Sequence, residues 1–144
     1  MKYREAEESD IQRIKELLYS SGLPSTDVDG QAQKIFVVES KGKLVGIGGI
    51  EDFGGIGLIR SITVAPEHRK NGIAMNLYQL LEEYACNSGI KALYLITESA
   101  KEYFQKLGFS AQEREAVPYL IKQTSQFSKL CPTSAAVMFK TLST

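Results

Sequence analysis

Residues 58–74 read LIRSITVAPEHRKNGIA, and this stretch decides the fold of the chain. Its first seven residues are mainly apolar and β-branched, which predicts a strand, and Pro66 ends that run. From Ile73 onward, apolar residues recur at helical spacing, and Gly72 stands where the helix begins. The first amides of a helix have no intrahelical partner and lie at its positive end, so they attract anions. The sequence therefore predicts an anion-binding turn just before Ile73.

The residue pattern of this turn differs from two other phosphate-binding loops. A Walker loop needs Gly-Lys-Ser/Thr, and a dinucleotide-binding fold needs GxGxxG after a strand, and neither pattern follows this strand. Residues 69–74 instead read R-x-x-G-x-A and follow VAPEH at 64–68. This combination resembles the pyrophosphate-binding loop of the Gcn5-related N-acetyltransferases. The segment FQKLGF at 104–109 resembles the second signature of the same family, commonly written with YEKLGF.

The resemblance covers essentially the whole chain and implies acetyl-CoA as the cosubstrate. Arg69, Gly72 and Ala74, with the amides between them, would bind the pyrophosphate, and a backbone amide around residues 62–64 would bind the reaction's oxyanion. The alternative is an ordinary strand-to-helix turn that carries a glycine by chance. The implied cofactor-binding residues are Ile62, Thr63, Val64, Arg69, Lys70, Asn71, Gly72, Ile73, Ala74 and Phe104.

Length and composition indicate one domain over residues 1–144 with a real hydrophobic core, since 43% of the residues are hydrophobic. Lysine and arginine together number 17, as do aspartate and glutamate, so nothing in the charge favours a nucleic-acid or membrane partner. Cys86 and Cys131 lie too far apart for a CxxC motif, and the N-terminus lacks the apolar core of a signal peptide. We therefore expect a cytoplasmic protein.

Apolar periodicity and turn residues give the expected order of elements. The predicted strands span 3–6, 35–39, 44–50, 58–64, 92–97, 110–116 and 136–142. The predicted helices begin at an N-cap on Ser9 and at 73, 98 and 118, and end near 22, 89, 107 and 130, with a loop at 21–30. Strand 92–97 is a continuous apolar run, which is typical of burial on both faces. Glycines at 46, 48 and 49 suggest a bulge or the close approach of a ligand or backbone.

This order predicts an α/β fold with a mixed sheet of six to seven strands and helices on both faces. In the resembled family, the two central parallel strands splay apart, and the pantetheine arm of the cofactor inserts between them. We expect the same splayed pair here, formed by residues 58–64 and 92–97.

The implied reaction is attack of a neutral primary amine on the acetyl thioester. Such an amine is mostly protonated at neutral pH, so a base must accept a proton directly or through water. Glu51 and Glu98, at the ends of neighbouring predicted strands, are the candidate bases. A tyrosine often helps the thiolate leave, but its position in the family signature holds Phe104, which cannot donate a proton. Tyr103 is a candidate acid, although its place about 100° around the helix also fits packing, and another hydroxyl or water is the alternative.

Arg60 interrupts an otherwise apolar central strand, so it must find a partner or reach a cleft. One interpretation is a fork for a substrate carboxylate or a phosphinate-like or arsinate-like anion. The other is an internal ion pair, for example with Glu51 or Glu98. The candidate acceptor-binding residues are Arg60, Ser61 and Thr97.

His68 and Cys131 each have a functional and a structural interpretation. His68 is the only histidine, yet the motif places it in the loop outside the acceptor site, which favours a surface histidine over a base. Cys131, beside Pro132, could contact trivalent arsenic, but such sites use several thiols and only Cys86 is available. We therefore favour a small buried hydrophobe at Cys131.

A narrower resemblance rests on LIRSI at 58–62, AVP at 116–118 and LCPTSA at 130–135. These segments resemble the small acetyltransferases encoded with arsenic-resistance genes, relatives of the phosphinothricin and arsinothricin N-acetyltransferases. This resemblance implies transfer of an acetyl group to the primary amine of a small, anionic, amino-acid-like acceptor. The alternatives are a non-catalytic acyl-CoA-binding module, which Phe104 favours, and acetylation of a peptide or protein amine. We expect a monomer or homodimer and no metal.

Overall fold

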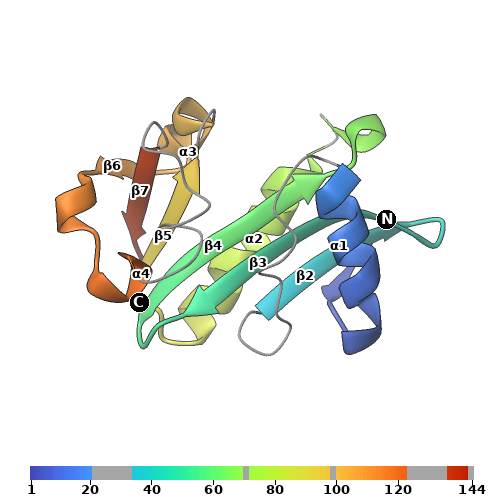
Figure 1. Cartoon of the computed structure of the whole chain (residues 1–144), viewed down its shortest axis with the longest axis horizontal. Helices are drawn as coiled ribbons and strands as arrows, with labels where there is room; N and C mark the ends of the chain where they lie inside the picture. The colour runs from blue at the N-terminus through green and yellow to red at the C-terminus, as the bar shows by residue number, and fades with distance from the viewer. Residues whose placement is uncertain (21–33, 70–71, 98–99, 123–135, 143–144) are drawn as a thin grey trace. The chain divides into compact units, whose positions relative to one another are not determined.

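The computed structural model describes residues 1–20, 34–69, 72–97, 100–122 and 136–142, whose strands pair in the order β1-β2-β3-β4-β5-β7-β6 (Figure 1). The strands are β1 (Lys2–Glu5), β2 (Lys34–Ser40), β3 (Lys43–Asp52), β4 (Ile56–Val64), β5 (Ala92–Thr97), β6 (Ser110–Gln112) and β7 (Ala136–Thr141). The α-helices are α1 (Ile11–Ser20), α2 (Ile73–Asn87), α3 (Lys101–Lys106) and α4 (Tyr119–Lys122). The predicted order of elements and the mixed α/β fold are confirmed over these residues.

The chain divides into two compact units. Unit 1 comprises Met1–Glu51 and Ile59–Tyr84, and unit 2 comprises Asp52–Leu58 and Ala85–Thr144.

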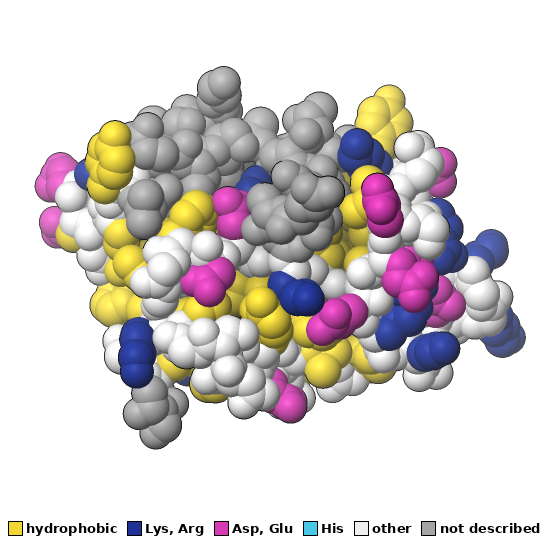
Figure 2. Space-filling model, turned by 90° about the horizontal axis from the view of Figure 1, so that it is seen from below, with side chains coloured by type: hydrophobic (Ala, Val, Ile, Leu, Met, Phe, Trp, Pro, Cys, Tyr) yellow, Lys and Arg dark blue, Asp and Glu magenta, His cyan; other side chains and the backbone are white. Residues whose placement is uncertain are grey.

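On the face drawn in Figure 2, basic side chains are interspersed with acidic ones, as equal numbers of the two charges would give.

Unit 1 contains the antiparallel strands β1, β2 and β3, most of β4, and helices on both faces, since α1 lies on one face and α2 on the other (Figure 1). Burial of an apolar stripe on each helix against the sheet is the main source of its stability. The side chains with almost no exposure include Ile14 and Leu18 of α1, Val37 and Ile47 of the sheet, and Leu77 and Leu81 of α2.

The glycines of β3 lie beside a bulge, as the sequence suggested, but the close approach there is mainly by side chains and not by a ligand or backbone. The β2–β3 register shifts between Val38, which pairs with Gly46, and Glu39, which pairs with Leu44, so Val45 is the extra residue of a bulge. The close approach at Gly46 and Gly48 comes chiefly from side chains of α2. The helix therefore lies closer to β3 than larger residues would allow.

Unit 2 begins with the start of β4, which pairs in parallel with β5 from Ile56–Leu58 to Ala92–Tyr94. This pairing involves the first three residues of β4. Strand β7 pairs antiparallel with both β5 and β6. A core cluster joins Leu58, Val117, Ile121 and Val137, with Phe53, Ile56, Tyr94 and Ile96 packed against it.

Three sequence predictions need correction. Ser9 is not the helix cap, because a 3-10 turn at Glu8–Asp10 precedes α1 and the Asp10 carboxylate accepts the Glu7 amide at 2.7 Å. The strand expected at 110–116 ends at Gln112, where a 3-10 turn at Arg114–Ala116 takes over and the Gln112 side chain binds the Ala116 carbonyl at 3.1 Å.

The third correction concerns β5, which is not fully buried on both faces. Its residues alternate, since Leu93 and Leu95 are buried whereas Tyr94 and Ile96 are half-buried. The loop at 21–30, the predicted helix beyond Lys122 and the segment 130–135 with Cys131 lie outside the described residues.

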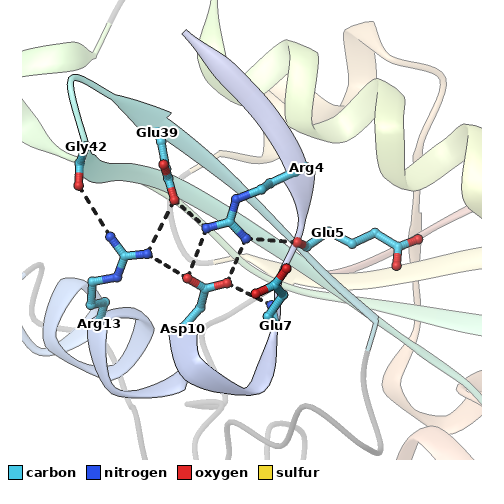
Figure 3. A network of polar contacts seen from close by, with 7 residues as sticks. All are labelled: Arg4, Glu5, Glu7, Asp10, Arg13, Glu39 and Gly42. Atoms are coloured by element: carbon cyan, nitrogen blue, oxygen red, sulfur yellow. Dashed lines mark hydrogen bonds and ion pairs between the residues drawn. The ribbon is translucent and has the colours of Figure 1, made fainter.

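A charged network joins β1, α1 and β2 in unit 1 (Figure 3). Asp10, only 2% exposed, accepts hydrogen bonds from Arg4 at 2.7 and 3.0 Å and from Arg13 at 2.7 Å. Glu39 pairs with Arg4 and, at 3.3 Å, with Arg13. The hydrogen bond from Arg4, more than the Glu7 amide or Arg13, holds the pKa of the Asp10 carboxyl well below its usual range. The network therefore stabilises the ionised form of Asp10 in the folded state.

We expect Asp10→Asn to lower the free energy of unfolding at neutral pH by about 2 kcal/mol. A depressed folded-state pKa contributes stability that is fully present above the unfolded pKa of about 4 and is lost as the pH falls below it. Wild-type stability should therefore fall between about pH 5 and pH 2, and the variant should fall less steeply. Urea unfolding across this range measures both effects. Glu5→Gln, which breaks the 3.3 Å surface pair with Lys34, is the matched control and should change stability by less than about 0.5 kcal/mol.

Candidate functional site

The candidate site lies where β4 leads into α2 in unit 1. After Val64 the chain leaves the strand at Ala65, whose amide donates to the Val45 carbonyl at 2.8 Å. Pro66 starts a 3-10 turn at Pro66–His68, in which the His68 amide donates to the Ala65 carbonyl at 2.9 Å. Proline fits the first turn because its missing N–H has no partner to lose there. The half-buried His68 thus belongs to the loop, as its position in the motif predicted.

Gly72 gives this junction its open approach. Its φ of +77° lies in the left-handed region that favours glycine, and among the described residues other than Gly72 and its chain neighbours, no heavy atom lies within 4 Å of the position that a Cβ would take. The first intrahelical bond at this end runs from the Asn76 amide to the Gly72 carbonyl at 3.0 Å. The amides of Ile73, Ala74 and Met75 therefore precede the helical ladder, at the positive end of the 15-residue helix α2. This geometry fits a phosphate group.

Arg69 is the described cation of the loop. Its side chain is exposed, and Nε donates to the Val64 carbonyl at 3.2 Å, which holds the guanidinium beside the end of β4. Lys70 and Asn71, two of the predicted cofactor-binding residues, lie outside the described residues. On β4, Thr63 and Val64 are buried and Ile62 is half-buried.

Arg60 and Glu51 form an ion pair within unit 1, with the Arg60 Nη1 atom 2.6 Å from Glu51 Oε1. The side chains of Arg60 and Glu51 are 6% and 18% exposed. Burial lowers the pKa of the Arg60 guanidinium, which reflects the cost of holding its charge away from water. The sequence left two interpretations open for Arg60, and the structure shows the internal ion pair with Glu51.

The other predicted residues belong to unit 2. The Thr97 hydroxyl accepts the Ala100 amide at 2.9 Å and so caps the approach to α3. Tyr103 is 40% exposed, and its ring lies edge-on to Phe104 at a centroid distance of 5.3 Å. Phe104 in turn packs edge-on to Phe109 at 5.6 Å. Glu98 lies outside the described residues, as does the side chain of Ser61.

The structure thus pairs Glu51 with Arg60, and it places this pair and the junction around Gly72 at separate positions along β3 and β4 in unit 1. Sequence reasoning missed that Val45 and Gly46 of β3 contact this junction. The signal was present, since an isolated glycine inside a strand often marks a close approach, but the sequence did not say to which element.

Comparison of the sequence with known protein families defines the class of protein. The sequence matches the Acetyltransferase (GNAT) family over residues 4–109, and the chain belongs to this family. The predicted superfamily and the predicted class of enzyme, an acetyltransferase, are confirmed. No curated protein sequence matches the chain at a significant level.

Solved structures of similar fold support the assignment. N-acetylglutamate synthase from Neisseria gonorrhoeae, complexed with coenzyme A and N-acetyl-glutamate, has a TM-score of 0.82 and 18% identity over 99% of this chain and 35% of that one. Rv2747 from Mycobacterium tuberculosis, in complex with CoA, has a TM-score of 0.81 and 21% identity over 99% and 100%. An aminoglycoside 6'-N-acetyltransferase with coenzyme A has a TM-score of 0.75 and 17% identity over 98% and 97%.

These identities establish a shared fold, and the chain spans only about a third of the Neisseria synthase. The prediction of acetyl-CoA as cosubstrate agrees with the family and with the coenzyme A in these three structures. Among the described residues, no helix is both long and apolar enough to span a membrane.

Proposed function

We propose that the chain transfers the acetyl group of acetyl-CoA to the primary amine of a small, anionic, amino-acid-like acceptor. The observation that carries the proposal is the β4–α2 junction, where Gly72, with a φ of +77°, stands before the first amides of α2 in a chain of the acetyltransferase family. We place this reaction in the cytoplasm, which the exposed free thiol of Cys86 suits, and expect a monomer or homodimer.

The junction holds the pyrophosphate of acetyl-CoA. The amides of Ile73 and Ala74 lie at the positive end of α2, and the Arg69 guanidinium adds a full positive charge to the same loop. Lys70 and Asn71 contribute amides from the same loop. Binding energy from this remote part of the cosubstrate orients the thioester, which is the bond that reacts.

In the reaction the amine nitrogen bonds to the acetyl carbon, the carbon–sulfur bond breaks, and the amine loses a proton. A backbone amide at residues 62–64 stabilises the oxyanion. We assign Glu51 as the base that accepts the proton through water, with Arg60 orienting its carboxylate, and keep Glu98 as the second candidate. The thiolate takes its proton from Tyr103 or from water, because Phe104 has no proton to give.

The acceptor is proposed from two likenesses. The Neisseria synthase was solved with N-acetyl-glutamate, an acetylated anionic amino acid. The segments at 58–62, 116–118 and 130–135 resemble acetyltransferases encoded with arsenic-resistance genes, whose relatives acetylate phosphinothricin and arsinothricin. Both compounds are amino acids with a second anionic group. Ser61 and Thr97 are the proposed acceptor-side residues. Because Arg60 pairs with Glu51, we propose that Arg60 serves the base instead.

A non-catalytic acyl-CoA-binding module is the second candidate, and one observation favours it. The position of the usual tyrosine holds Phe104, which packs against Phe109 instead of offering a hydroxyl. Such a module would bind acetyl-CoA without turnover.

Release of free CoA thiol from acetyl-CoA separates these functions. The purified protein is mixed with phosphinothricin, arsinothricin, glutamate, neutral amino acids, polyamines or a lysine peptide. We expect amine-dependent release with the anionic amino acids and none with acetyl-CoA alone. Release with the peptide alone would replace the proposed acceptor, and acetyl-CoA binding without release by any amine would support the binding module.

A further inference from the structure

Two neighbouring residues of β3 contact both ends of the loop that binds the cofactor. The Val45 carbonyl accepts the amide of Ala65, the first residue after β4, at 2.8 Å. Gly46 lies against Ile73, the first residue of α2, since a Cβ built on Gly46 would be 3.1 Å from Ile73 Cγ2. We call Val45 and Gly46 the β3 seat.

The bulge in β3 coincides with this seat. Val45 is the residue without a partner in the β2–β3 register, between the Val38–Gly46 and Glu39–Leu44 pairs. Bulges are features that redirect a strand locally, and they occur often beside functional sites. Here the bulged residue is the one whose carbonyl holds the start of the loop.

At Gly46 there is little space between β3 and helix α2. The Cγ2 atom of Ile73 is bonded directly to Cβ, and β-branched side chains in helices are held to one χ1 rotamer. An added Cβ on Gly46 would also lie 3.3 Å from Leu77 Cδ1 and 3.5 Å from the Thr63 carbonyl oxygen. Ile73 and Leu77 are 2% and 0% exposed, so neither can turn outward. The first turn of α2 must move to admit even one methyl group.

Gly48 provides a comparison on the same strand and under the same helix. A Cβ there would lie 3.2 Å from Leu81 Cδ1, the far end of a flexible side chain, and 3.5 Å from Ile62 Cγ1. Leu81 is also buried, but its Cδ1 atom is a terminal methyl group two torsions from the backbone, so a small shift of this group can relieve the contact with less movement of the helix backbone than at Gly46. The contact also lies two turns away from the amides at the start of α2.

We propose that the β3 seat is a positioning device for the cosubstrate. Val45 fixes where the loop leaves β4, Gly46 fixes how closely α2 begins beside it, and together they set the spacing between Arg69 and the amides of Ile73 and Ala74. This inference rests on the proposed binding of acetyl-CoA at the junction. Misplacement by a fraction of an ångström matters because each hydrogen bond to the pyrophosphate depends on the position of a fixed backbone donor.

The test is a pair of methyl additions, Gly46→Ala and Gly48→Ala, with calorimetric titration of acetyl-CoA and thermal melting of each protein. Both variants should melt a few degrees lower than wild type, because both crowd the core. We expect Gly46→Ala to weaken acetyl-CoA binding about tenfold and Gly48→Ala to change it less than about twofold. Removal of the clashing atoms in Gly46→Ala/Ile73→Ala should restore affinity toward that of Ile73→Ala alone.

The outcomes distinguish this inference from the proposed function. If wild-type protein does not bind acetyl-CoA, the proposed function fails. If wild type binds and the two glycine variants lose affinity equally, or not at all, the seat has no positioning role. If Gly46→Ala does not fold, Ile73→Ala is the second test, because it removes the Cγ2 atom that lies against Gly46 without adding bulk. It should weaken binding about twofold to threefold, and unchanged affinity would overturn the inference.

Discussion

Replacement of Gly72 by aspartate is expected to weaken acetyl-CoA binding at least about 100-fold while the protein stays folded. The new carboxylate would stand in front of the helix amides, where no described residue beyond the chain neighbours of Gly72 has a heavy atom within 4 Å of the added Cβ. There it would repel the pyrophosphate and compete for the same donors. Calorimetric titration with acetyl-CoA measures the loss, and circular dichroism checks the fold.

Gly72→Asn is the matched control for this variant. Aspartate and asparagine have the same shape, and both adopt the left-handed backbone more readily than other residues do, which matters because φ at Gly72 is +77°. The conformational cost of replacing glycine is therefore the same in both variants, and the difference between their acetyl-CoA affinities measures the effect of the added negative charge. We expect Gly72→Asn to retain most of its affinity. Equal affinity of the two variants would contradict the assignment of the junction as the pyrophosphate site.

The fold could be predicted from sequence because its signals are local. The run 58–64, the turn after Pro66 and the helical spacing from Ile73 all lie within a few residues of one another, and the structure places β4 and α2 there. The helix end near Gly89 was equally local, since Gly89 has a φ of +79° and the Ile90 amide returns to the Ala85 carbonyl at 2.9 Å.

The errors arose where contacts distant in sequence decide the structure. Ser9 fits a capping pattern, but Asp10 holds the turn because Arg4 on β1 and Arg13 on α1 reach it at once. The residues 110–116 form only a short strand because the chain must turn before Pro118, and a propensity for strands cannot show this.

The candidate site likewise contains some residues that local sequence could predict and others whose partners lie far away in the sequence. The motif identified Arg69, Gly72 and Ile73, since their roles depend on a loop whose conformation they determine themselves. The partner of Arg60 could not be chosen between Glu51 and Glu98, because strand pairing and side-chain direction decide that choice. The role of Gly46 was also hidden, because its neighbour Ile73 lies 27 positions further along the chain.

The Arg60–Glu51 pair supplies the second large effect. We expect Glu51→Ala to lower the free energy of unfolding by about 3 kcal/mol, because it removes a carboxylate from 2.6 Å beside a guanidinium that is 5% exposed. Arg60→Met keeps the length and apolar stem of the arginine and removes the buried charge. In the double variant Glu51→Ala/Arg60→Met, no such charge remains to be compensated, so it should be more stable than Glu51→Ala alone. Urea unfolding of the four proteins gives the coupling energy, and additive effects would show that the pair is not coupled.

Enzyme kinetics test whether the Arg60–Glu51 pair also takes part in the reaction. Glu51→Gln retains an acceptor for Arg60 but cannot take a proton, so kcat should fall about 100-fold with an acetyl-CoA affinity equal to that of wild type. If Arg60 orients this base, Arg60→Met should also lower kcat and leave the KM of an anionic acceptor unchanged. A raised KM for anionic acceptors alone, with kcat retained, would instead assign Arg60 to the acceptor. A fall in kcat for both variants would connect the stability of unit 1 to its chemistry, because the costly buried charge would then hold a reacting carboxylate in place.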